Sequence, residues 1–287
     1  MTLRSPSISA PRIAELKDFW IAVKDPSTRA AIAKRMQVDA SNLDVRAGFD
    51  TIRQILPPRR DWKTQAGQDF EVSLKRYDTL VSSSARLALG KGRRGAPTES
   101  QRHLSQASLV LGIGSFDAYV RQFTIDGYST LFFGSGTSKQ PSQRVREKFH
   151  QAIKKVVQGN PDLVLELARE QPMIAKTHLA ADVFDIEQIR LLTSSFADVQ
   201  TALDSLGIDL KATATPVERQ FLDLAGPIFD AYCAARHVAM HAGVGATRGT
   251  STRGRVATLY CANDQPARFL GDFLRAFAYL IEGRVHW

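Results

Sequence analysis

The stretch ATATPVERQFLDLAGPIFDAYCAARHVAMHAG, residues 212–243, decides the fold class of this 287-residue chain. Thr215 can cap a helix, and Pro216 and Glu218 suit a first turn, where a proline loses no hydrogen bond and an acid faces the positive end of the helix dipole. Apolar residues then recur every three or four positions and predict one buried face: Phe221, Leu224, Ile228, Tyr232, Ala235 and Ala239. Gly243 ends this pattern, so we expect one long helical segment here.

The same periodicity indicates helices along the rest of the chain. We expect them over residues 13–23, 27–37, 43–56, 70–89, 100–125, 141–157, 161–170, 186–206 and 264–281. Neither internal repeats nor alternating strands and helices are evident, so the predicted fold class is all-α, a helical bundle with an additional N-terminal helical region.

A flexible basic loop, GKGRRGAP at Gly90–Pro97, is the best candidate for a domain boundary. It would separate an N-terminal helical extension, residues 1–90, from a helical domain over residues 98–287. Further helices at about 141–206 would be inserted in that second domain.

The middle of the helix expected over residues 100–125 is too apolar to lie on a surface. Gly112, Gly114 and Ser115 are small, and we expect them to let another helix approach closely, at some cost in intrinsic helix stability.

The chain is basic, with 38 Lys and Arg against 29 Asp and Glu and a net charge of +9. Such a surface attracts polyanions, of which nucleic acid is the commonest, although a basic protein without such a partner is the alternative. The two cysteines are too few for a disulfide framework. With neither an apolar leader nor a stretch long enough to span a membrane, we expect a cytoplasmic protein.

The segment CAARHVAMHAG, residues 233–243, allows three interpretations. Its basic groups could simply complement the negative end of the helix dipole. Cys233, His237 and His241 share one helix face and could bind zinc, yet they span more than about 10 Å along the axis, too far for one ion to reach all three easily. The third interpretation pairs Arg236 with His241 as a site for phosphate chemistry.

In this context the chain resembles the HEPN superfamily, α-helical domains found in many metal-independent ribonucleases. The family signature is an arginine, a polar residue, a short spacer and a histidine at the end of a late helix. Arg236, His237 and His241 match those places, although the family often has Asn or Asp where His237 stands. The helix with the sequence ASLVLGIGSFDAYVRQF resembles the family helix that packs beside the motif and carries an acid, a place that Asp117 fits.

A second arginine and histidine pair, Arg144 and His150, has a similar spacing. It lacks a partner helix of the expected kind and a helix end after it. We therefore interpret it as a chance match.

The resemblance implies a metal-independent endoribonuclease without a cofactor. The chemistry agrees, because a histidine near its ordinary pKa suits proton transfer and an arginine fork suits the phosphate oxygens. Five positions on a helix turn the two side chains about 140° apart. Two motifs facing each other across a dyad would surround a phosphate better, so we expect a homodimer. The auxiliary residues would be His237, which orients the site, and Asp117.

RNA is the expected partner, and Arg93, Arg94 and Arg121 are candidate RNA-binding residues. The resemblance also implies a role as a toxin or an antiviral-defence effector, with an antitoxin or a defence-system partner protein. Two alternatives are a non-catalytic HEPN-like module that binds RNA or protein, and a zinc-dependent hydrolase.

Overall fold

The computed structural model describes residues 8–24, 52–89, 99–133, 143–159, 162, 195–241 and 264–285. Within these ranges the chain is helical and contains no strand, which confirms the all-α fold class. The helices are α1 (Ala10–Lys24), α4 (Gln65–Leu89), α5 (Glu99–Phe133), α6 (Gln143–Gly159), α9 (Phe196–Ser205), α10 (Pro216–His241) and α12 (Asp264–Glu282). The predicted boundary at Gly90–Pro97, and all of residues 163–194, lie outside the described part.

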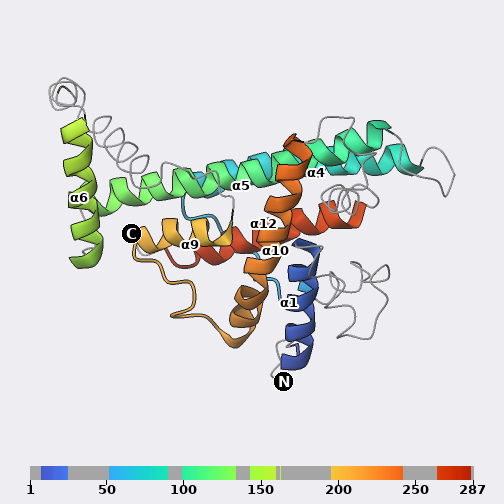
Figure 1. Ribbon diagram of the computed structural model, residues 1–287, viewed down its shortest axis with the longest axis horizontal. Coiled ribbons are helices and arrows are strands. Elements are labelled where there is room, and N and C mark those ends of the chain that lie inside the picture. Colours follow the sequence, from blue (N-terminus) through green and yellow to red (C-terminus); the bar gives the residue numbers. More distant parts are fainter. Residues whose placement is uncertain are drawn as a thin grey trace.

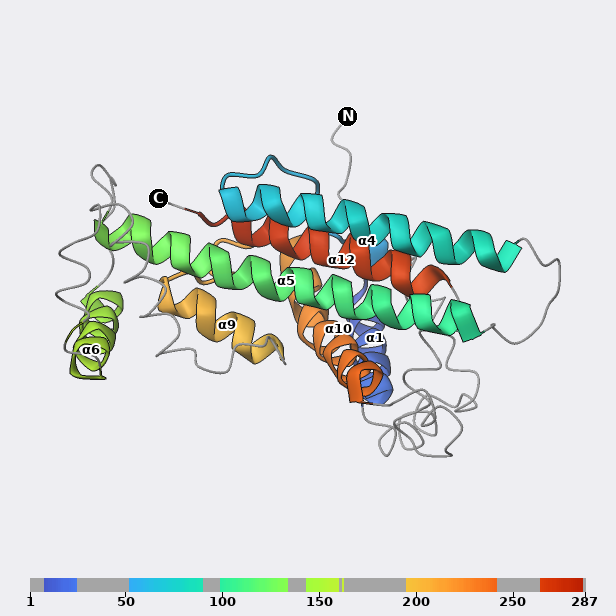
Figure 2. The ribbon, with the colours of Figure 1, turned by 90° about the horizontal axis from the view of Figure 1, so that it is seen from above.

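The long helices α4 and α5 lie side by side as one layer, and α12 packs against both of them, below that layer in Figure 1 (Figures 1 and 2). Helix α9 packs along α5 on the other side of that helix from α4, and α10 crosses the layer steeply, with α1 beside it (Figures 1 and 2). Helix α6 lies beyond the far end of α5, at one end of the long axis. The motif helix α10 is therefore enclosed by α1, α5, α9 and α12.

The core is a single cluster of apolar side chains whose largest fully buried members are aromatic. Phe116 of α5 is fully buried at a point where several helices meet. Its ring centroid lies 5.3–5.8 Å from four others, a normal spacing for packed aromatic rings: Phe70 at 5.8 Å, Tyr119 at 5.8 Å, Phe229 at 5.4 Å and Phe277 at 5.3 Å. These contacts join α4, α5, α10 and α12 through one residue.

Helices on both sides of the predicted boundary contribute to this core. Trp20 of α1 is fully buried, with its ring centroid 5.8 Å from that of Tyr232 on α10 and 6.1 Å from that of Phe269 on α12. The N-terminal helix α1 therefore covers one side of the motif helix.

The small residues of α5 divide between two environments. A side chain at Gly112 would lie 3.0 Å from the Tyr77 ring and 3.3 Å from Leu270, so close packing there requires glycine, as expected. A side chain at Gly114 would meet nothing within 4 Å, because Gly114 is exposed. The expectation of a close helix contact is confirmed for Gly112 and wrong for Gly114.

Helix α10 begins with the cap that the sequence predicts. The Glu218 N–H donates to the Thr215 hydroxyl at 3.2 Å, and the Thr215 N–H donates to Glu218 Oε2 at 2.9 Å. These reciprocal bonds form a capping box, which satisfies two backbone donors at the helix start. The helix then continues through Pro227 to His241 without a break, so the segment does not restart at that proline.

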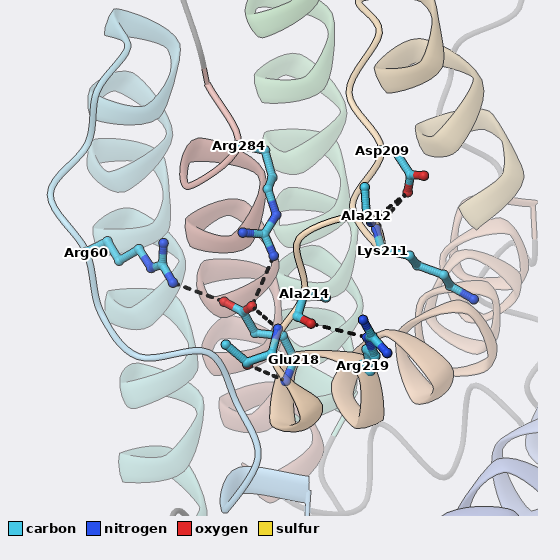
Figure 3. Close-up of polar contacts among 9 residues, drawn as sticks. Arg60, Asp209, Lys211, Ala212, Ala214, Glu218, Arg219 and Arg284 are labelled. Carbon is cyan, nitrogen blue, oxygen red and sulfur yellow. Dashed lines mark hydrogen bonds and ion pairs between the residues drawn. The ribbon is translucent and has the colours of Figure 1, made fainter.

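The Glu218 carboxylate has a second role beyond the cap (Figure 3). It is buried and lies 3.0 Å from one guanidinium nitrogen of Arg60 and 3.0 Å from one of Arg284. Burial alone would raise the pKa of Glu218, but the Thr215 N–H, Arg284 and Arg60 together outweigh that effect and lower the pKa below its ordinary value. The start of α10 is thereby joined to the segment before α4 and to the turn after α12.

A second buried carboxylate, Glu282, holds the segment that leads into α4. It accepts hydrogen bonds from the Lys63 N–H at 2.9 Å, the Thr64 N–H at 3.1 Å and the Thr64 hydroxyl at 2.6 Å. The Tyr119 hydroxyl donates to Glu282 Oε1, the oxygen that also accepts from the Thr64 hydroxyl, at 3.3 Å. A side chain at Gly67 would lie only 2.6 Å from the Trp62 ring and 2.7 Å from Glu282, so this position requires glycine.

Candidate functional site

The candidate site lies on the last two turns of α10. Cys233 and Arg236 are buried, whereas His237 and Met240 are exposed. The apolar positions of this segment already pack against α1 and α5 within one chain, which leaves Ala234 and Ala239 half-buried. Much of the apolar surface of this segment is thus covered by the chain itself.

Arg236 is the unusual residue of this segment. It is only 9% exposed, and its Nε is buried without a hydrogen-bond partner among the described residues. A buried donor without a partner costs about 1–3 kcal/mol, and more when the group is charged. A buried donor without a protein partner can bind a water, an ion or a ligand, so Arg236 is a candidate binding group.

The pKa of the Cys233 thiol, one turn before Arg236, depends on the charges around this part of α10. Burial raises the pKa of Cys233 to about 12; Arg236 opposes that rise, and three carboxylates add to it. The carboxylates come from three helices: Asp230 of α10, Asp117 of α5 and Asp198 of α9. Acids from α5, α9 and α10 therefore lie close enough to the Cys233 thiol to influence it.

Asp117 is the member of this group that the sequence predicts. It is half-buried on α5, the helix that packs beside α10, and it acts on the same thiol as Arg236. Asp117 and Arg236, 119 positions apart in the sequence, thus both influence the pKa of Cys233, and their pairing at a site stays a prediction.

Two other acids of the site, Asp198 and Asp230, were not singled out by sequence reasoning. Asp230 accepts a hydrogen bond from the Phe196 N–H at 2.8 Å, and Asp198 forms a capping box with Ser195 at the start of α9. The Ser-x-x-Asp spacing of that box was a signal available in the sequence. Both acids fix the N-terminal end of α9 against α10.

The remaining predicted residues are Arg121, His241, Arg93 and Arg94. Arg121 is exposed on α5, one turn beyond Asp117 toward the end of that helix. His241 is the last residue of α10, and its side chain lies outside the described part, as do Arg93 and Arg94. The roles assigned to these residues stay predictions.

The alternative zinc site at Cys233, His237 and His241 gains no support from the Cys233 environment. Zinc binds the thiolate, and burial disfavours that form of Cys233. No group of three or more His, Cys, Asp or Glu residues suited to a metal ion occurs among the side chains that the structure describes.

No described helix combines the length and the apolar character needed to cross a membrane. Comparison with models of protein families, with curated proteins and with solved structures finds no match for the chain. Functional inference therefore depends on the residues and their geometry.

Proposed function

We propose that the chain is a metal-independent endoribonuclease of HEPN type, with Arg236 and His241 as its catalytic residues. The observation that supports this proposal best is the Arg236 Nε, which has no described hydrogen-bond partner, while Asp117 influences the same Cys233 thiol as Arg236. A guanidinium with an unused donor can bind a phosphate oxygen, and a nearby carboxylate can orient it.

The proposed reaction needs no group from outside the chain. A base removes the proton of the RNA 2′-hydroxyl, the 2′-oxygen attacks the adjacent phosphorus, and an acid protonates the leaving 5′-oxygen. The products are a 2′,3′-cyclic phosphate, which water can open to a 3′-phosphate, and a 5′-hydroxyl. His241 takes part in these proton transfers, and Arg236 stabilises the charge on the phosphorane.

In this proposal the active form is a homodimer, because one motif leaves one side of a phosphate without donors. Met240, an exposed apolar residue at 60%, and the half-buried Ala239 give α10 a small apolar surface beside the motif. The biological role proposed with this activity is that of a toxin or an antiviral-defence effector, with an antitoxin or defence-system protein as partner.

A non-catalytic HEPN-like module that binds RNA or protein is the second candidate. The observation that favours it is the burial of Arg236 within one chain, since a catalytic arginine must reach its substrate. For the ribonuclease proposal to hold, the end of α10 must open or rearrange when RNA binds, so that Arg236 reaches the substrate.

The deciding experiment incubates the purified full chain with mixed RNA in EDTA and identifies the new RNA ends. Wild-type protein should generate cyclic-phosphate ends, and the Arg236→Ala, His241→Ala double variant should not. Because Arg236 is buried, the more conservative Arg236→Lys variant should be tested beside the double variant. Circular dichroism should show that each variant is folded. RNA that is bound but not cut by folded wild-type protein would favour the module.

A further inference from the structure

Helix α6 carries an unusual share of the positive charge of the chain. Its 17 residues include five Lys or Arg and one Glu, a net charge of +4 out of +9 for the whole chain. The motif helix and its neighbours over residues 195–241 hold more acids than bases. The strongest basic surface among the described helices is therefore separate from the candidate catalytic residues.

The apolar face of α6 is already occupied. Phe149 is 4% exposed and stacks on Phe132 of α5, with 3.7 Å between ring centroids, while its centroid lies 5.7 Å from that of Tyr128. These contacts attach α6 to the last turns of α5. Only the polar face of the helix is left for a partner.

That polar face presents a basic stripe, defined here as Arg146, His150 and Lys154. The three residues are exposed and follow one another at intervals of four, so they share one side of the helix over about 12 Å. The single acid, Glu147, accepts a hydrogen bond from Gln143 within the same helix. No ion pair joins Arg146 or Lys154 to a described residue.

We propose that the basic stripe of α6 binds the phosphate backbone of the RNA substrate at a distance from the reacting phosphate, an inference that rests on the proposed ribonuclease function. Charge complementarity points to a polyanion, and Arg146 and Lys154, with the hydrogen-bonding His150 between them, suit a chain of phosphates. A membrane surface fits less well, because an interfacial helix must insert a free apolar face, and Phe149 is used inside the protein.

The position of α6 determines what the stripe does. Phe132, its contact on α5, lies fifteen residues beyond Asp117, which is roughly 22 Å along the helix axis at ~1.5 Å per residue. Figure 1 shows α6 at one end of the molecule and α10 crossing α5 further along. The stripe is thus too far away to touch the bond that is cut, and it contributes affinity and strand alignment.

The test compares two double variants that remove equal charge. Arg146→Gln with Lys154→Gln removes two cations of the stripe, and Lys75→Gln with Arg76→Gln removes two exposed cations of α4. Fluorescence anisotropy with a labelled single-stranded RNA of mixed sequence gives Kd at several salt concentrations. The α6 variant should bind at least tenfold more weakly and lower the log–log salt slope by about 1.4, since each phosphate contact on a single strand contributes about 0.7.

Cleavage kinetics supply the second measurement. The α6 variant should raise KM and leave kcat unchanged, because the stripe holds substrate and transition state equally. If both double variants weaken RNA binding to the same extent, the effect is one of net charge and the α6 proposal is wrong. Binding of wild-type protein to phosphatidylserine vesicles but not to RNA would also overturn it.

The two proposals fail in different ways. Wild-type protein that binds RNA through α6 but cuts no RNA would contradict the ribonuclease and leave the binding surface standing. Protein that cuts RNA, with α6 variants that bind and cut like wild type, would contradict the binding surface alone.

Discussion

Glu218 and Arg284 form a buried ion pair, with 3.0 Å between Glu218 Oε2 and an Arg284 nitrogen, that joins the first turn of the motif helix to the turn following α12. Because the same carboxylate also closes the capping box with Thr215 and binds Arg60, one side chain fixes the direction in which α10 leaves the loop. Whatever chemistry the far end of α10 performs depends on this fixed start.

Glu218→Gln should destabilise the protein by about 3 kcal/mol, at the lower end of the range for removing one partner of a buried ion pair. Arg284 would lose its charged partner inside the protein, whereas Arg60 keeps access to water. Urea unfolding measures the change. Asp223→Asn is the matched control on the same helix, because Asp223 is exposed and its contact with Lys211 is long, at 3.9 Å. Equal losses for the two variants would contradict the role given to Glu218.

The stability due to Glu218 should also depend on pH. Its pKa is lowered in the folded protein, so its contribution is present above the ordinary value of 4.5 and is lost as the pH falls through the lower folded value. The difference in unfolding free energy between wild type and Glu218→Gln should therefore be constant near neutral pH and shrink in acid. A difference that stays the same down to the acid transition would show that the carboxylate is not stabilised by its partners.

Two glycines in long helices should respond in opposite ways to alanine. Gly67→Ala should destabilise the protein by about 1–3 kcal/mol, because the new methyl group would overlap the Trp62 ring and Glu282. Gly114→Ala should stabilise it by about 0.5–1 kcal/mol, since that methyl group meets nothing and alanine favours the helix. The measurement is the change in thermal unfolding temperature of each variant. Changes of the same sign in both variants would contradict the packing around Gly67.

Cys233 should resist thiol reagents while the protein is folded. Burial excludes the reagent and raises the pKa of the thiol to about 12, so very little thiolate exists at neutral pH. Reaction with 5,5′-dithiobis(2-nitrobenzoate) should be slow in buffer and fast in denaturant. The measurement is made in a Cys261→Ser background, which leaves Cys233 as the single cysteine. Rapid labelling of the native protein would mean that the end of α10 is open.

His241→Ala should lower the rate of RNA cleavage about a hundredfold or more, the usual loss for a general acid–base. His237→Ala should cost less, because His237 is assigned to orientation of the site. Asp223→Asn, a change of an exposed residue on the same helix with no role assigned at the site, is the control and should cleave at the wild-type rate. The assignment fails if His241→Ala cuts normally, or if its loss of activity merely follows a loss of structure.

The local features of this fold were readable from the sequence because they depend on neighbours along the chain. Thr215, Pro216 and Glu218 predicted the start of α10, and its core face follows the apolar spacing. Helix α5 continues to Phe133 instead of ending near Ile125, because Tyr128 and Phe132 gain a partner in Phe149 that no local pattern reveals.

Features that depend on distant partners were not predictable in this way. Nothing near Glu218 in the sequence indicates Arg60, 158 residues before it, and nothing distinguishes Gly112, packed on Tyr77, from the exposed Gly114. At the candidate site, the pattern predicted that Asp117 accompanies Arg236. The burial of Arg236 and the approach of Asp198 and Asp230 arise from the packing of α9 and α10.

The ion pair between Glu218 and Arg284 has a consequence for the stage of synthesis at which the protein can finish folding. Helices α4 and α5 emerge from the ribosome well before α10 and α12, yet Phe116 and Glu282 need partners from both groups. Contacts between such distant residues form slowly, and the earlier helices expose their aromatic faces until the later ones arrive. Nascent chains that stop before Arg284 should therefore be captured by chaperones that recognise apolar surface, and chains that include it should escape.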